Sequence, residues 1–190
     1  YRSVALTIDH HCLDPRAPQL AEEVARLREL LARHNLRCVI ETGARFLLDP
    51  ARKHQPTLLS PTPDERDRRL AFLRHAVDVA AAVGADAVSF WSGTPVDDAT
   101  NETCWTRLVE GCRRLVDHAA QRDIRLAFEP EPGMFLETMA QFARLRAAVD
   151  HPDFGLTLDV GHVHCLGDGD IAEHIRAFRH VLWNLHLEDM

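Results

Sequence analysis

Short apolar runs alternate with longer amphipathic stretches along this chain of 190 residues. The long stretches repeat apolar residues at helical spacing and predict helices over 18–35, 63–83, 103–122, 136–149 and 170–178. The short runs predict strands over 3–9, 36–42, 85–91, 124–130, 154–160 and 181–188. Because strands and helices alternate in this way, we expect a mainly parallel sheet.

The alternation of side chains within the strands favours a barrel over an open doubly wound sheet. In the last predicted strand the apolar face carries Trp183, Leu185 and Leu187, opposite His186 and Glu188. Strands of an open sheet tend to be apolar on both faces, whereas a barrel has an interior that becomes polar towards its C-terminal mouth. We therefore predict an α/β fold of the (β/α)8 TIM-barrel type.

Six predicted strands are fewer than the eight of a complete barrel. We interpret 1–190 as a single TIM-barrel domain with about six of the eight strands, lacking the first and last. A smaller closed arrangement is the alternative.

Composition narrows the classes of function. A net charge of −7 argues against broad nucleic-acid binding, which depends on a basic surface. No apolar run approaches the roughly 18 residues of a membrane span, and no signal-peptide pattern opens the chain, so we expect a cytoplasmic protein. The five cysteines form no CxxC pair and are interpreted as reduced thiols.

The ends of the predicted strands carry ionisable side chains. On a parallel barrel these ends converge at one mouth, where several carboxylates would repel one another unless a cation neutralised them. Carboxylates with an imidazole suit Mg²⁺, Mn²⁺ or Zn²⁺, so we expect one divalent metal ion. The strand-end residues expected to point into the mouth are Asp9, Glu41, Glu129, Asp159, His186 and Glu188.

Each candidate ligand also has a structural interpretation. Glu129 is suited to capping a turn at Pro130, Asp159 to satisfying backbone amides before Gly161, and His186 to packing in the core. Their expected convergence favours the interpretation as ligands.

Further candidates lie in the connections. His162 is within reach of a substrate or a second metal, and Trp91 is suited either to stacking on a sugar ring or to packing. The segment over 41–61 is long for a connection, and such loops are often functional. Arg45, Arg52 and Lys53 are suited there to holding an anionic group such as a phosphate or carboxylate, and a solvated surface loop is the alternative. Histidines in predicted helices and connections, His54 among them, are expected to be solvated.

Five short motifs carry a resemblance to a known family. ETG at 41–43, SFWSG at 89–93, FEPEPG at 128–133, LDVGH at 158–162 and HLEDM at 186–190 resemble the xylose-isomerase-like TIM-barrel superfamily. The sugar phosphate isomerase/epimerase group is the most similar. The resemblance implies a divalent metal held by Glu, Asp, His and a second Glu. Glu129, Asp159 and His186 match the first three, and the second Glu belongs to a final strand that this sequence lacks.

The same resemblance implies a function. We expect a metal-dependent sugar or sugar-phosphate isomerase/epimerase working through a metal-stabilised ene-diolate, with a small-molecule sugar substrate and a possible homo-oligomer. The expected catalytic residues are Glu129, also a base, and His162; the expected substrate-binding residues are Glu41, Trp91, Glu131 and Glu188.

Three alternatives remain. One is a metal-dependent phosphodiesterase resembling endonuclease IV, from which this chain departs at ETG and SFWSG, where that nuclease carries zinc-binding histidines. The others are a related dehydratase or lyase and a barrel that has lost its site.

Overall fold

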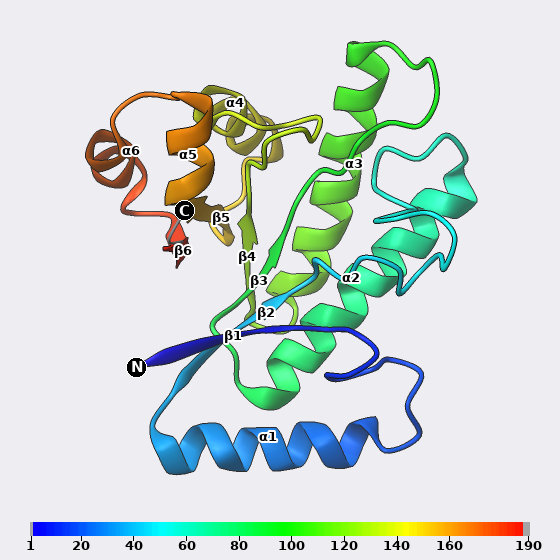
Figure 1. Ribbon diagram of the computed structural model, residues 1–190, viewed down its shortest axis with the longest axis vertical. Coiled ribbons are helices and arrows are strands. Elements are labelled where there is room, and N and C mark those ends of the chain that lie inside the picture. Colours follow the sequence, from blue (N-terminus) through cyan, green and yellow to red (C-terminus); the bar gives the residue numbers. More distant parts are fainter. Residues whose placement is uncertain (1, 188–190) are drawn as a thin grey trace.

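The computed structural model describes residues 2–187, and within them six strands form one sheet in chain order (Figure 1). Each strand pairs in parallel with the next. The sheet curls with helices along its outer side, so the structure is part of a (β/α)8 barrel and the predicted fold class is confirmed. The strands are β1 (Ser3–Thr7), β2 (Arg37–Glu41), β3 (Ala87–Phe90), β4 (Arg125–Phe128), β5 (Phe154–Asp159) and β6 (Leu182–His186).

Among residues 2–187, five of the six helices correspond closely to predicted ones. The helices are α1 (Leu20–His34), α2 (Pro63–Val83), α3 (Asn101–Ala120), α4 (Met139–Val149), α5 (Val160–Leu166) and α6 (Ile171–Phe178). None of these helices is long and apolar enough to cross a membrane.

Side-chain caps set where several helices begin. The backbone N–H of Glu65 donates to the Thr62 side chain at the start of α2. A reciprocal capping box between Thr138 and Gln141 starts α4 at Met139, three residues later than the periodicity predicts. The short helix α5 is absent from the predictions because its apolar pattern spans only seven residues.

The core lies between the outer face of the sheet and the helices. Phe90, Phe128 and Phe154 project from adjacent strands, with ring centroids of the first two 5.3 Å apart in an edge-to-face contact. Phe142 of α4 stacks on Phe128 and Phe154 at centroid distances of 6.4 Å. Burying these four rings gives the outer face much of its apolar area, and it fixes which strand residues face inwards.

The inner face carries small and polar side chains in register. Ser89 pairs with Ala127, and Ala127 pairs with Gly155. The Thr157 hydroxyl donates to Ser89 Oγ over 3.0 Å. Since side chains alternate along a strand, the next inward positions towards the C-terminal ends of β4 and β5 are Glu129 and Asp159.

A β-bulge between β5 and β6 corrects one prediction. Leu156 pairs with Leu182 but Thr157 pairs with Asn184, so Trp183 is an extra residue. Its indole lies against Gly155, where an added Cβ would be 2.1 Å from Nε1, and under the Arg125 guanidinium, 4.3 Å from the ring centroid. Trp183 therefore lies towards the inner face, and the expectation that it shares the outer face with the next leucines is wrong.

Candidate active site

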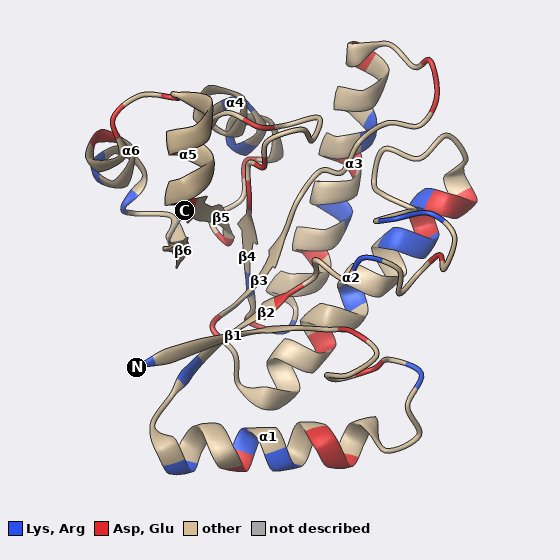
Figure 2. Cartoon of the chain, in the orientation of Figure 1, with Lys and Arg blue, Asp and Glu red and all other residues tan. Residues whose placement is uncertain are grey.

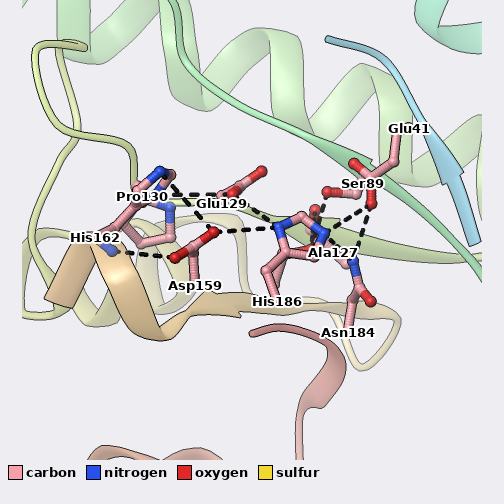
Figure 3. A network of polar contacts seen from close by, with 10 residues as sticks. Glu41, Ser89, Ala127, Glu129, Pro130, Asp159, His162, Asn184 and His186 are labelled. Carbon is pink, nitrogen blue, oxygen red and sulfur yellow. Dashed lines mark hydrogen bonds and ion pairs between the residues drawn. The ribbon is translucent and has the colours of Figure 1, made fainter. Parts of the chain in front are cut away.

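Three strand ends bring two carboxylates and an imidazole together. Asp159 and His186 are the last residues of β5 and β6 and are paired in register, so their side chains point the same way. Glu129 follows β4 directly and shares the inner face. One candidate ligand atom from each of the three lies within 4.8 Å of the others, and Figure 3 shows the side chains converging.

The imidazole of His186 lies between carboxylates on both of its edges. Nδ1 is 3.2 Å from Glu129 Oε1 and 3.5 Å from Asp159 Oδ2, and Nε2 is 3.0 Å from Glu41 Oε1. Hydrogen bonds to Asp159, Glu129 and Glu41 raise the pKa of His186 to about 12, and burial opposes them only in part. The centre therefore strongly favours a positive charge at this point.

Glu41 holds the far edge of this ring, and Asn184 in turn holds Glu41. The Asn184 amide donates to Glu41 Oε1 over 3.0 Å and lies 3.0 Å from His186 Nε2 (Figure 3). Glu41, at the end of β2, thus contacts His186 and also lines the cavity. Its predicted contact with substrate stays a prediction.

Asp159 has both of the roles considered for it from the sequence. It is 2% exposed, and it accepts the backbone N–H of His162 over 3.0 Å as the N-cap of α5. Burial acts to raise its pKa, but hydrogen bonds from His186 and from the His162 amide hold the pKa of Asp159 below its ordinary value. Its other oxygen faces the cluster, and the carboxylate is ionised.

His162 lies beside the cluster on the first turn of α5. Its Nδ1 is 3.1 Å from the Pro130 carbonyl oxygen and 3.7 Å from Glu129 Oε1. Its Nε2 is 3.9 Å from Asp159 Oδ2. The ring is therefore held at the edge of the carboxylate group, where it can reach a bound molecule.

A cavity of about 350 Å³ opens over these groups. A volume of this order suits a small-molecule site. It contains most of the predicted site residues, including Glu41, Trp91, Glu131 and His162. The lining residues are Thr7, Glu41, Gly43, Arg45, Lys53, His54, Trp91, Glu129, Glu131, Asp159, His162 and His186.

Two of these predicted substrate contacts have distinctive surroundings. Burial raises the pKa of Glu131, and the charge of Glu129 adds to that effect. Trp91 is only 5% exposed, with the Arg69 guanidinium 4.7 Å from its ring centroid and His54 edge-on at 5.0 Å. Little of the Trp91 ring is therefore left open for stacking on a sugar.

Other sequence expectations fall outside the cavity or outside the described residues. Asp9 accepts the backbone N–H of His10, and its backbone pairs with Cys12, so it does not line the cavity. Arg52 is paired with Asp49 and Glu65 and is also not part of the lining. The predicted substrate contact Glu188 lies outside the described residues.

His54 is a cavity residue that sequence reasoning missed. It was expected to be solvated, yet it is half-buried in the cavity wall, with its Nδ1 shielded from solvent. Its backbone has φ of 64°, a conformation uncommon for residues other than glycine. The only sequence signal was its place beside Lys53 in the long loop after β2.

Fold and site together define a (β/α)-barrel protein with a carboxylate–histidine cluster at the C-terminal ends of its strands. The profile of the xylose isomerase-like TIM barrel family matches residues 1–190. The chain therefore belongs to that family, and the predicted superfamily is confirmed.

Individual relatives agree with this assignment. An inosose dehydratase of Geobacillus thermodenitrificans is 29% identical over 89 residues, covering 45% of this chain and 28% of that protein. A crystal structure of D-allulose 3-epimerase from Methylomonas sp. has a TM-score of 0.75 at 23% identity, over 98% of this chain and 60% of the other. A structure described as IOLI protein with a binding zinc atom has a TM-score of 0.74 at 15% identity, over 100% of this chain and 63% of the other. This chain thus spans less than two thirds of the length of these relatives.

Proposed function

We propose that this chain forms the main part of the active site of a sugar isomerase/epimerase that depends on one divalent metal ion. The observation that carries the proposal is the convergence of Glu129, Asp159 and His186 beside a cavity of about 350 Å³. The family and the epimerase among its structural neighbours support the reaction class, and the neighbour with a bound zinc atom supports the metal.

The donor set fits such an ion. Two buried carboxylates and an imidazole are ligands that Mg²⁺, Mn²⁺ and Zn²⁺ accept. Nδ1 of His186 faces Glu129 and Asp159, while Glu41 engages the opposite nitrogen. When bound, the ion would act as a Lewis acid on neighbouring carbonyl and hydroxyl oxygens of a sugar and make the adjacent C–H bond more acidic.

The residues around this centre suit proton transfer. Glu129 is an acceptor for the proton on the carbon next to the carbonyl, and its Oε1 lies 3.7 Å from His162 Nδ1. Nδ1 of His162 donates to the Pro130 carbonyl oxygen over 3.1 Å, so Nε2 is the ring nitrogen that is left to contact a substrate hydroxyl. Glu131, kept less acidic by burial, is a candidate to bind a sugar hydroxyl.

A dehydratase is the second candidate, and the similarity to an inosose dehydratase favours it. It would share the first step, removal of a proton next to a carbonyl, and would then lose a hydroxyl group as water. An isomerase/epimerase product keeps every atom of the substrate, whereas a dehydratase product lacks one molecule of water, so the mass of the product separates the two functions.

Proton exchange tests the shared step directly. Ketoses and inososes are incubated with the protein and Mn²⁺ in D₂O, and loss of the C–H signal next to the carbonyl is followed by NMR. We expect exchange with at least one substrate and its loss in Glu129→Gln, because the amide cannot accept the proton and is a weaker metal ligand than the carboxylate. Arg52→Gln, outside the cavity, is the matched control. Undiminished exchange in Glu129→Gln would remove Glu129 as the base.

A further inference from the structure

Part of the cavity lining is basic. Arg45, Lys53 and His54 all line it, and all three come from the loop between β2 and α2. Figure 2 shows Lys and Arg along this loop, whereas the strand ends near the cluster carry acids. The two kinds of charge therefore face one space from different parts of the fold.

The two cations at the mouth have no partner among residues 2–187. Neither Arg45 nor Lys53 forms an ion pair with a described carboxylate, although the nearby Arg52 pairs with Asp49 at 2.7 Å and with Glu65 at 3.2 Å. The charge of Lys53 acts on Glu131 across the cavity without forming an ion pair with it. As far as residues 2–187 are concerned, both cations are thus open to a ligand.

Arg69 is a buried cation that contacts Trp91 in the cavity lining. Arg69 is 2% exposed, and in the described part of the chain its guanidinium contacts the Thr42 carbonyl oxygen at 3.4 Å and the rings of Phe72 and Trp91. Burial lowers its pKa to about 10, which still leaves it charged at neutral pH. A buried charge without a counter-ion is costly, and an anion nearby would relieve that cost.

His54 connects these cations. Burial lowers its pKa, and the charges of Lys53, Arg69 and Arg45 lower it further, so three cations act on one imidazole ring. Its Nδ1 is buried without a hydrogen-bond partner in the described structure. Positive charge is therefore concentrated around the His54 ring at this part of the cavity lining.

We propose that Arg45, Lys53 and His54, backed by Arg69, form an anion-binding subsite, and that the substrate carries a phosphate or carboxylate group there. Arg and Lys recognise such groups through charge-assisted hydrogen bonds. The carbon skeleton of the substrate then extends from the loop to Glu129 and His162. The subsite rests on the proposed function because it lines the same cavity as the proposed catalytic centre.

Binding of inorganic phosphate to the metal-free protein tests the subsite without any assay of activity. Phosphate is titrated into wild type, Lys53→Gln and Arg45→Gln at constant ionic strength and followed by calorimetry. The matched control is Arg52→Gln, which removes an equal charge from the same loop but outside the lining. Circular dichroism checks that each variant is folded.

We expect saturable binding by wild type, weakening of about tenfold in Lys53→Gln and in Arg45→Gln, and no change in Arg52→Gln. Equal weakening in all three variants would mean attraction to net charge alone and would overturn the subsite. Absence of phosphate binding would overturn it too, while intact metal binding by the same protein would leave the proposed function standing.

A second titration identifies the anionic group. Hexose, hexose 6-phosphate and hexuronate are compared on the metal-loaded protein. Tighter binding of one anionic sugar than of hexose, lost in Lys53→Gln, names phosphate or carboxylate as the group. Equal binding of all three would overturn the assignment of an anionic substrate.

Discussion

Glu41 Oε1 lies 3.0 Å from Nε2 of His186, on the edge of the ring opposite Glu129 and Asp159. Metal-binding histidines commonly donate their second ring N–H to a carboxylate, which fixes the orientation of the ring and makes it a stronger ligand. Glu41 therefore has the position of a group that orients His186 towards the candidate metal centre.

Replacing Glu41 with Gln is expected to weaken metal binding by about tenfold or more, because the negative charge behind the imidazole is lost. Calorimetric titration with Mn²⁺ or Zn²⁺ measures the affinity. Glu131→Gln removes a cavity carboxylate without touching His186 and serves as the control. An unchanged affinity in Glu41→Gln would contradict the orienting role.

Metal binding is also expected to release protons. Asp159, Glu129 and Glu41 raise the pKa of His186 to about 12, so the metal-free protein holds a charged imidazole at neutral pH. Because a coordinating histidine is neutral, binding at pH 7 should release about one proton. Titrations in buffers with different ionisation enthalpies count it. A heat that is the same in every buffer would show that His186 keeps its proton.

Because Trp183 lies against Gly155 of β5, we predict that residue 155 does not tolerate a side chain. A Cβ at residue 155 would lie 2.1 Å from Trp183 Nε1 and 2.3 Å from the Val181 carbonyl oxygen. Gly155→Ala should therefore lower the free energy of unfolding by about 1–3 kcal/mol, the cost typical of overpacking. Urea denaturation measures the change. Wild-type stability in this variant would mean that the bulge at Trp183 relaxes freely.

The surroundings of His54 predict a pH dependence of stability. Burial, followed by Lys53, Arg69 and Arg45, lowers its pKa from 6.5, so the unfolded chain binds more protons than the folded one between the two pKa values. The stability that the folded protein gains from keeping the His54 ring neutral is complete above pH 6.5. It is lost as the pH falls through the lower pKa of the folded state.

His54→Gln should make the free energy of unfolding depend less on pH below pH 6.5. Denaturation of the two proteins between pH 5 and pH 8 gives the comparison, since a glutamine has no proton to gain there. Parallel profiles for the two proteins would mean that His54 titrates alike in the folded and unfolded chains.

The fold and the core of the site follow from patterns that the sequence carries locally. Strand alternation places Glu129, Asp159 and His186 on one face, and parallel pairing brings their strand ends together. Both inferences use only the period of the strand and the convergence of parallel strands.

The features of the fold and the site that sequence patterns did not predict depend on tertiary contacts. The bulge that turns Trp183 inwards inserts one residue into a regular alternation. The burial of His54 depends on how the loop after β2 packs against Trp91. The single-domain interpretation of 1–190, the homo-oligomer and the cytoplasmic location stay predictions.

The central claim is that Glu129, Asp159 and His186 hold a divalent ion, and metal content tests it most directly. Wild type, His186→Ala and the control Arg52→Gln are equilibrated with Mn²⁺ or Zn²⁺, dialysed and measured by elemental analysis, with folding checked by circular dichroism. We predict about one ion per chain in wild type and control, and its loss in folded His186→Ala. Folded wild type that takes up neither ion, or His186→Ala that keeps a full equivalent, would contradict the proposed centre.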